Sequence, residues 1–327
     1  MAWLIFIASS AILVLAAVKI AQYGDVIAVR TRLGGMFVGV LLLAGATSLP
    51  ELLTTINSFN QGVPQMAAGN LLGSNMFNML LLAVLDLLNQ QARILRRVAM
   101  THALTAALAC AMIALAVFFI LADVHIQIGW VGVDSLVLIA VYIGGIRLIQ
   151  ENGQASSTAV ELPAGQPAMP LWRAGLGFAA ATGVLVVVTP WLVRSSNEIA
   201  EITGLGAGFV GTTLLALVTS LPEMVAVITA ARLGAYDMAV GNLFGSNVFN
   251  MFALGVSDTF YIPGRFLAVI DPSFALVGLL GLLLTMLALI GNIARVERRL
   301  FFVEADALLI ALVYFGGMYF LYMRGIG

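Results

Sequence analysis

The feature that most constrains this chain is a series of ten long apolar segments, each long enough to cross a lipid bilayer. A membrane-spanning helix needs about 20 mostly apolar residues. Hydrophobic residues make up 61% of the 327 residues and charged residues only 9%, far less charge than a soluble globular protein carries. The sequence therefore predicts an all-α membrane protein with ten transmembrane helices. The segments cover roughly residues 2–20, 34–60, 65–90, 98–121, 129–149, 171–194, 204–231, 237–260, 272–294 and 305–323.

One long polar interruption divides the chain into two halves. Residues 151–170, ENGQASSTAVELPAGQPAMP, are rich in Gly, Ser, Pro and Gln, a composition typical of a flexible linker. The first five segments belong to residues 1–150 and the last five to residues 171–327. The first segment has no basic residues before it and no small-residue cleavage site, so we expect a retained helix and not a signal peptide.

The two halves share a repeated segment. Residues 37–86 recur as residues 209–258, with an offset of 172 residues and about half of the positions identical, without a gap. Such self-similarity indicates a shared structural unit. Because each half contains five spans, an odd number, the second copy must enter the membrane from the opposite side. The sequence thus predicts two inverted five-helix repeats, an arrangement that places a transporter's binding site near the bilayer midplane.

Basic residues lie mostly on one side of this ten-helix arrangement. Loops on the cytoplasmic face of a membrane carry an excess of Lys and Arg. We therefore expect the linker in the cytoplasm and both termini outside. The side of the linker holds Lys19, Arg30, Arg32, Arg93, Arg96, Arg97, Arg147, Arg173, Arg232, Arg295, Arg298 and Arg299, and the other side holds Arg194, Arg265 and Arg324.

The pentapeptide Thr-Ser-Leu-Pro-Glu places a carboxylate inside an apolar segment in each half. Thr47 and Glu51 are four residues apart and so share one face of a helix. Pro50 has no N–H and opens the preceding turn, which exposes carbonyl oxygens beside the carboxylate. The same pattern recurs at residues 219–223. Carboxylate, carbonyl and hydroxyl oxygens suit a hard cation such as Ca²⁺ or Na⁺.

A packing role would explain part of this motif. Pro kinks, and Ser and Thr contacts between helices, are common in membranes. A Glu at the centre of a span is different, because it costs roughly 2.5 kcal/mol or more, judged from the insertion cost of Asp, Lys and Arg. Two such residues at matched positions, Glu51 and Glu223, therefore predict a functional site.

A second motif, GNLLGSNMFN at residues 69–78, recurs as GNLFGSNVFN from Gly241. Asn70, Ser74 and Asn78 follow one another at intervals of four and form one polar stripe on a helix. Gly69 and Gly73 have the small-xxx-small spacing that lets another helix approach closely. Asn70 and Asn75, the latter off the stripe, can be read as interhelical amide contacts. Ser74 and Asn78 are better candidates for neutral cation ligands.

The composition excludes several other kinds of site. One Cys leaves no disulfide framework or Cys-rich metal centre, and two His leave none based on histidine. A net charge of −1 gives no sign of nucleic acid binding. We expect no cofactor and no enzymatic activity.

Taken together, the paired motifs resemble the alpha repeats of the calcium:cation antiporter superfamily, and most closely those of the sodium/calcium exchangers, including their short bacterial relatives. The resemblance covers essentially the whole chain. It implies an antiporter that exchanges Ca²⁺ for Na⁺ by alternating access, as a monomer in the lipid bilayer of a prokaryotic inner or plasma membrane. It also implies that the first and sixth helices slide across the remaining core.

The resemblance implies a set of cation ligands at the matching positions. Glu51 and Glu223 would be the central carboxylates, shared by Ca²⁺ and the counter-ion. The other ligands would be hydroxyl, amide and carbonyl oxygens. Thr47 and Thr219 would contribute carbonyls and hydroxyls, Ser48, Ser220, Ser74 and Ser246 would complete flanking Na⁺ sites, Asn78 and Asn250 would face the centre, and the carbonyls of Ala44 and Ala216 would lie at the two mouths.

Two departures from the family pattern concern the ions. Many exchangers carry an Asp at one of the positions matching Asn78 and Asn250, and the family often has Gly where this chain has Ala46 and Val218. Three alternatives stay open: H⁺ as the counter-ion or another cation as substrate, an intramembrane hydrolase that uses two carboxylates, and a channel. Proton-coupled relatives usually carry a Glu after the Gly-Asn pair, which is absent here. Inverted halves with one midplane site favour alternating access over a channel.

Overall fold

The computed structural model describes residues 1–31, 44–88, 101–153, 169–294, 299–300 and 303–326. Nearly all of these residues are helical. The first half contains α1 (Ala2–Thr31), α3 (Leu49–Asn60), α4 (Pro64–Leu88), α6 (Thr101–Ala122) and α7 (Val133–Gly153). The second half contains α8 (Leu171–Thr203), α9 (Ala207–Val210), η2 (Gly211–Leu215), α10 (Ala216–Thr219), α11 (Leu221–Arg232), α12 (Tyr236–Ser257), η3 (Asp258–Phe260), α13 (Phe266–Val269), α14 (Phe274–Ala294) and α15 (Ala305–Arg324).

Two small hairpins interrupt the helices, and the sequence patterns did not predict them. Strands β1 (Gln127–Ile128) and β2 (Val131–Gly132) pair antiparallel, with Gln127 opposite Gly132. Strands β3 (Arg299–Leu300) and β4 (Val303–Glu304) pair in the same way. Each hairpin joins two long helices, so the protein remains a helical bundle.

Eight helices in the described part of the chain are long and apolar enough to cross a membrane. The pair Ala207–Thr219 and Leu221–Arg232, which meet at a bend of 40°, counts as a ninth span if the two helices cross the membrane as one. The expected second span, residues 34–60, includes residues 34–43, which lie outside the described residues. The count of ten spans therefore stays a prediction.

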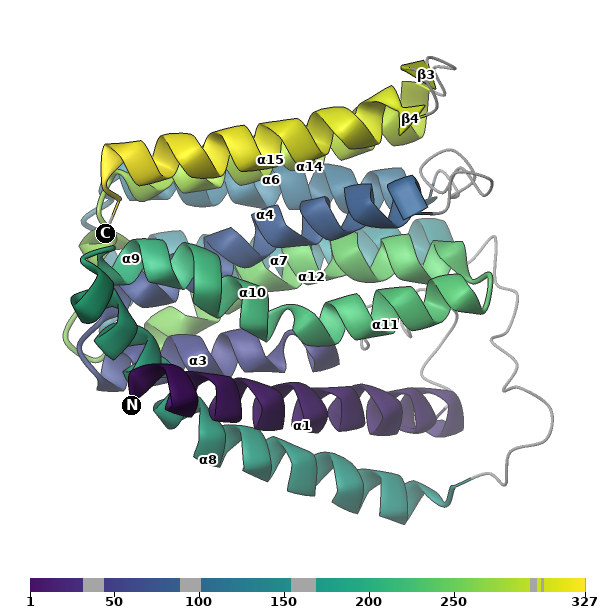
Figure 1. The fold of residues 1–327 in the computed structure, drawn as a ribbon, viewed down its shortest axis with the longest axis horizontal. Helices are drawn as coiled ribbons and strands as arrows, with labels where there is room; N and C mark the ends of the chain where they lie inside the picture. Colours follow the sequence, from purple (N-terminus) through teal and green to yellow (C-terminus); the bar gives the residue numbers. More distant parts are fainter. Residues whose placement is uncertain (32–43, 89–100, 154–168, 295–298, 301–302, 327) are drawn as a thin grey trace.

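The helices are arranged around a buried centre formed by α4 and α12. Each of these two helices is buried over 83% of its most apolar stretch, and both pack against α3, while α6 and α14 cover them further out. Helices α1 and α8 run side by side along one flank, and α14 and α15 lie along the opposite flank (Figure 1). Large apolar side chains such as Leu4, Val187, Leu283 and Phe315 are exposed, as lipid-facing surfaces require.

The apolar core consists of two separate clusters. One joins α4, α6, α12 and α14, and the other joins α1 and α8 to residues such as Met66, Val210 and Leu215. The α1–α8 pair is thus a packed unit of its own beside the main core. The bent helices that carry the two Glu residues contact both units.

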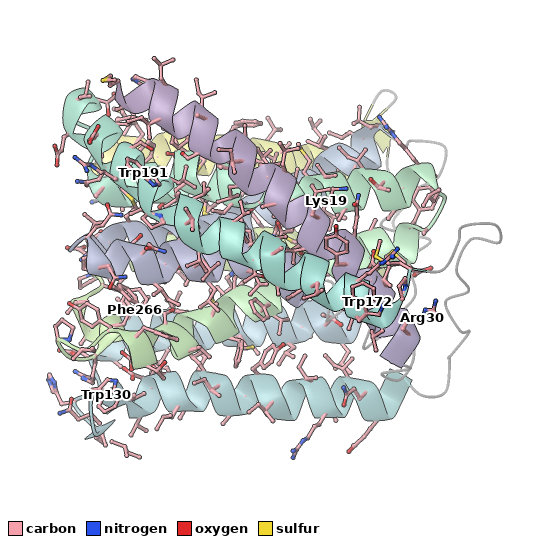
Figure 2. All side chains as sticks on the ribbon, turned by 90° about the horizontal axis from the view of Figure 1, so that it is seen from below. Lys19, Arg30, Trp130, Trp172, Trp191 and Phe266 are labelled. Carbon is pink, nitrogen blue, oxygen red and sulfur yellow. The ribbon has the colours of Figure 1, made fainter. Side chains whose placement is uncertain are left out.

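The two ends of the bundle can be told apart by their side chains. Trp172 and Arg30 lie at one end, with Lys19 on the same side, and Trp130 lies at the other (Figure 2). Both chain termini lie at the end of the bundle opposite the C-terminal end of α1 (Figure 1), whose last turn carries Arg30. Trp residues are enriched where helices meet the membrane–water interface, so these two ends mark the membrane surfaces.

Candidate cation site

The two bent helices break at the same residue of the repeated motif. Ser48 has φ −89° and ψ 7°, and Ser220 has φ −89° and ψ 4°. Each new helix begins at the following Leu, with Pro in its first turn and Glu directly after the Pro. Proline is favoured there because the first N–H groups of a helix have no helical partner. The Glu side chains therefore start at the positive end of a helix dipole, which favours a carboxylate.

The two carboxylates are buried and held by serines of the opposite half. Glu51 is 1% exposed and Glu223 is fully buried. The hydroxyl of Ser48 donates to Glu223 Oε1 at 2.9 Å, and the hydroxyl of Ser220 donates to Glu51 Oε1 at 3.2 Å. This reciprocal exchange joins the two helix breaks across the inverted repeat. It also accounts for the repeated Ser-x-x-Glu spacing, because each Ser serves the other half's Glu.

The next layer comes from α4 and α12. Ser246 donates to Glu223 Oε1 at 3.4 Å. Asn250, one turn further along the same face of α12, donates its Nδ2 to Asn75 Oδ1 at 3.0 Å. Asn78 of α4 donates its Nδ2 to Asn247 Oδ1, also at 3.0 Å. Both asparagine amides of the predicted ligand set therefore turn their nitrogens toward a neighbouring helix.

Five buried side-chain oxygens of the predicted ligand set have no hydrogen-bond donor among the described residues. Buried polar atoms are nearly always satisfied in proteins, so a group of unsatisfied oxygens calls for an explanation. All five can accept and coordinate, and the two carboxylate oxygens carry charge. The five atoms are Glu51 Oε2, Glu223 Oε2, Ser74 Oγ, Asn78 Oδ1 and Asn250 Oδ1.

The remaining predicted ligands are buried at the same helix breaks. The Thr47 hydroxyl donates to the carbonyl of Ala44 at 3.1 Å, and the Thr219 hydroxyl donates to Asn70 Oδ1 at 3.0 Å. The carbonyl of Ala44 also accepts the N–H of Ser48, and the carbonyl of Ala216 accepts the N–H of Ser220. The hydroxyl oxygens of Thr47 and Thr219 keep lone pairs for a cation, whereas the two carbonyls already accept protein donors.

Close helix contacts bring α4 onto the broken helix of the second half. A Cβ added at Gly69 would lie 2.5 Å from the carbonyl oxygen of Gly208, and one added at Gly73 would lie 2.4 Å from that of Thr212. Neither position has room for a side chain. The close approach expected from the small-xxx-small spacing is confirmed.

The interhelical amide contact expected of Asn75 is confirmed, but the sequence predicts neither its partner nor any role for Asn247. Both residues lie off the polar stripe. In the structure they hydrogen-bond to the candidate ligands Asn250 and Asn78. The signal available was the repetition itself, since Ser-Asn recurs at 74–75 and 246–247. An Asn that is identical in both repeats but lies off the polar stripe suggests a contact between the two halves.

Comparison with known proteins identifies close relatives of this architecture. The family described as "Sodium/calcium exchanger protein" matches residues 1–148 and 174–323 of this chain. The protein CaxA of Alkalimonas amylolytica is 29% identical over 298 residues, which cover 88% of each chain.

Two solved structures share the fold. The structure of the H⁺/Ca²⁺ exchanger CAX gives a TM-score of 0.76 at 15% sequence identity, covering 99% of this chain and 85% of that chain. A structure of the sodium–calcium exchanger NCX_Mj gives a TM-score of 0.62 at 20% identity, covering 98% of this chain and 99% of that chain. This likeness confirms the predicted fold class of a helical membrane protein with inverted repeats.

Proposed function

Because the chain belongs to the sodium/calcium exchanger protein family, within the calcium:cation antiporters, we propose that it exchanges Ca²⁺ for Na⁺ across a membrane. The family consists of transporters and not of catalytic enzymes. The observation that carries the proposal is the set of five buried oxygens without donors, two of which belong to carboxylates. A divalent cation beside the two carboxylates would draw its ligands from oxygens of this kind, since hard cations such as Ca²⁺ take six to eight oxygen ligands.

Charge supports a divalent ion at this site. Glu51 and Glu223 together supply a charge of −2 when ionised, and Asn78 and Asn250 add none. Uncompensated charge inside a membrane is expensive. One Ca²⁺ or two Na⁺ would balance the charge of −2. Ca²⁺ and Na⁺ could therefore compete for the same two carboxylates during exchange.

Different oxygens would serve the two ions. Both Glu side chains, with the hydroxyls of Thr47 and Thr219, would form the central site. Ser48, Ser220, Ser74 and Ser246 would contribute to flanking Na⁺ sites, with the carbonyls of Ala44 and Ala216 at the entrances. Each of these carbonyls already accepts a backbone N–H, and because a carbonyl oxygen has two lone pairs, the second one could coordinate a cation.

The division of the core into two clusters supports alternating access as the transport mechanism. Because α1 and α8 pack on each other as a separate unit beside the main core, sliding of this pair across the bent helices could open the site to one side at a time. One chain supplies both Glu residues, so we propose that a monomer is sufficient for transport. No nucleic acid or cofactor is needed.

Proton-coupled Ca²⁺ exchange is the second candidate. The fold likeness to the H⁺/Ca²⁺ exchanger CAX has the higher TM-score of the two, 0.76 against 0.62. At 15% identity that likeness concerns the fold alone. A transport measurement with Na⁺ and H⁺ gradients therefore distinguishes the two counter-ions.

A flux assay decides between these functions. Purified protein in liposomes loaded with Na⁺ should take up ⁴⁵Ca²⁺ when the outside is free of Na⁺, and an imposed pH gradient alone should drive little uptake. Uptake driven by the pH gradient and indifferent to Na⁺ would establish the proton-coupled candidate. Uptake without any counter-ion gradient, growing only with the Ca²⁺ gradient, would indicate a channel.

Membrane orientation is a separate part of the proposal. We propose that the linker lies in the cytoplasm and both termini outside, in the inner or plasma membrane of a prokaryote. Cys110 is the only Cys and is buried, so a single cysteine introduced by Ser156→Cys can be labelled selectively. An impermeant thiol reagent should label it in inverted membrane vesicles and leave it unlabelled in intact cells. The opposite pattern would reverse the orientation.

A further inference from the structure

Four asparagines form two hydrogen-bonded pairs across the repeat axis, and the two pairs are anchored differently. Asn78 of the first half pairs with Asn247, and Asn250 of the second half pairs with Asn75, each at 3.0 Å between Nδ2 and Oδ1. An asparagine amide presents an oxygen on one side and two N–H donors on the other. Only the oxygen can bind a cation, so the orientation of Asn78 and Asn250 decides whether each one is a ligand.

The orientation of Asn78 is fixed through Asn247. The Nδ2 of Asn247 donates to the backbone carbonyl of Asn75 at 3.3 Å and lies 3.5 Å from the hydroxyl oxygen of Thr285. Thr285 uses its own proton on the carbonyl of Gly281, at 2.7 Å, so its oxygen is left to accept. A flipped Asn247 would turn its oxygen toward two acceptors. The Oδ1 of Asn247 therefore faces Asn78. Asn78 donates to it through Nδ2, which leaves the Oδ1 of Asn78 without a protein donor.

No such anchor holds Asn75. Its Nδ2 is buried and has no partner among the described residues. The position 172 residues before Thr285 is Ile113, a fully buried apolar side chain without a hydrogen-bonding group. If Asn75 and Asn250 flip together, one hydrogen bond between them is lost and an equivalent one forms. No contact of Asn75 with the described residues other than Asn250 therefore fixes the orientation of this pair.

We propose that Asn247 and Thr285 are positioning residues that lock Asn78 as an oxygen ligand of the transported cation, whereas Asn250 is held only by Asn75 and can offer either its oxygen or its N–H groups. This inference rests on the proposed function, because it concerns the same cation site. A bound cation draws in the Asn250 oxygen. When the cation has left, the N–H groups of Asn250 can turn in and donate toward the ionised carboxylates.

The test compares the two positioning asparagines by the Ca²⁺ concentration that gives half-maximal exchange, the KM for Ca²⁺, in liposomes. Asn247→Ala removes the lock on Asn78, and we expect the KM to rise about tenfold, which is the effect of one hydrogen bond to a charged or coordinating group. Asn75→Ala removes a partner that supports both orientations of Asn250. Its KM should rise about threefold or less.

Repeating the Asn247→Ala substitution in a protein that already carries Asn78→Asp distinguishes a positioning role of Asn247 from a general structural role. Asn78→Asp places an oxygen toward the cation in either orientation, so the lock becomes unnecessary. In that background the second carboxylate oxygen faces Asn247 Oδ1, an acceptor, in place of the lost Nδ2 donor, so Asn247→Ala should not raise the KM for Ca²⁺ relative to Asn78→Asp alone. A merely structural role of Asn247 would raise the KM, or lower the maximal rate, equally in both backgrounds.

Several outcomes would overturn the inference. Equal effects of Asn247→Ala and Asn75→Ala would remove the difference in anchoring, and a rise in the KM on Asn247→Ala beside Asn78→Asp would remove the positioning role. If Asn247→Ala does not fold, Thr285→Val keeps the shape of the side chain and should raise the KM about twofold in the native background alone. Failure of the unaltered protein to exchange Ca²⁺ would contradict the proposed function itself, a result distinct from all of these.

Discussion

Asn70 and Asn242 occupy matched positions in the two halves and are both buried, yet only Asn70 is hydrogen-bonded. Asn70 donates to the carbonyl of Glu51 at 3.2 Å and to the hydroxyl of Thr54 at 3.0 Å, and it accepts from Thr219. Neither side-chain atom of Asn242 has a partner among the described residues. The repeat thus preserves the residue without preserving its contacts.

The reason lies in the neighbours. The position that matches Thr54 is Ala226, which offers no hydroxyl. Thr47, which matches Thr219, donates to the carbonyl of Ala44 and not to Asn242. The backbone of the first-half helix break is therefore tied to α4, while the second-half break lacks the equivalent tie. The two Glu residues are matched in the two halves, but the hydrogen bonds that hold the surrounding backbone are not.

A second difference concerns the α1–α8 unit. In α8, Thr189 accepts from Asn57 Nδ2 at 2.8 Å, and the carbonyl of Pro190 accepts from Gln61 Nε2 at 2.9 Å. Asn57 belongs to α3, and Gln61 caps its C-terminal end. The matching residues of the second half are Thr229 in α11 and Leu233 at its C-cap, and the matching part of α1 is apolar. The first-half bent helix is thus tied to the α1–α8 unit by two amides for which α11 has no counterpart at these positions.

The largest expected effect comes from the pair that is matched in both halves. Glu51→Gln and Glu223→Gln keep the side-chain shape and remove one of two buried charges. Each carboxylate would form a buried ion pair with the bound Ca²⁺, and losing one partner of a buried ion pair costs about 3 kcal/mol, so we expect Ca²⁺ exchange in liposomes to fall about 100-fold or more for either variant, with the protein still folded.

The control is Glu198→Gln, at a half-exposed residue of α8 that pairs with Arg194 at 3.2 Å. It should retain most of the exchange activity, because surface ion pairs contribute little. Normal exchange by Glu51→Gln or by Glu223→Gln would remove that residue from the site.

The comparison between Asn70 and Asn242 predicts a difference in stability. Asn70→Ala removes three hydrogen bonds, while the hydroxyls of Thr54 and Thr219 can still donate to carbonyls of the preceding turn, so we expect a loss of about 2 kcal/mol in the free energy of unfolding. Asn242→Ala removes a side chain without partners and should cost at least about 1 kcal/mol less. Thermal unfolding of the two purified variants in the same detergent measures this, and equal losses would show that the two halves are supported alike.

The tie between α3 and α8 predicts a smaller effect. Thr189→Val keeps the side-chain shape and removes the acceptor of Asn57, which weakens one hydrogen bond worth about 1 kcal/mol. If this bond favours one transport state, the ratio of the KM for Ca²⁺ measured at the two membrane faces should change about two- to fivefold. Thr229→Val is the matched control, since its hydroxyl donates only within α11, to the carbonyl of Val225, and should leave the ratio unchanged. A ratio that Thr189→Val also leaves unchanged would mean that the tie is neutral between states.

Much of this architecture could be predicted from the sequence because membrane helices are recognised by the length of their apolar segments. The inverted repeat followed from an offset and an odd number of spans, and the buried Glu pair from its cost in an apolar segment. The reciprocal bonds from Ser48 to Glu223 and from Ser220 to Glu51 could not be derived, because they depend on how the two breaks face each other. The same holds for Asn75 and Asn247, whose partners lie in the opposite half and not on their own helix face.

The most direct test of the central claim is the position of the bound cation. Crystals of the protein grown with Ca²⁺ should show an anomalous difference peak within about 2.3–2.6 Å of Glu51 Oε2 and Glu223 Oε2, the usual distance of Ca²⁺ from its oxygen ligands. Asn78 Oδ1 should contact the same ion. A Ca²⁺ peak elsewhere in the bundle, with both Glu side chains still without a cation, would contradict the claim that these two carboxylates form the transport site.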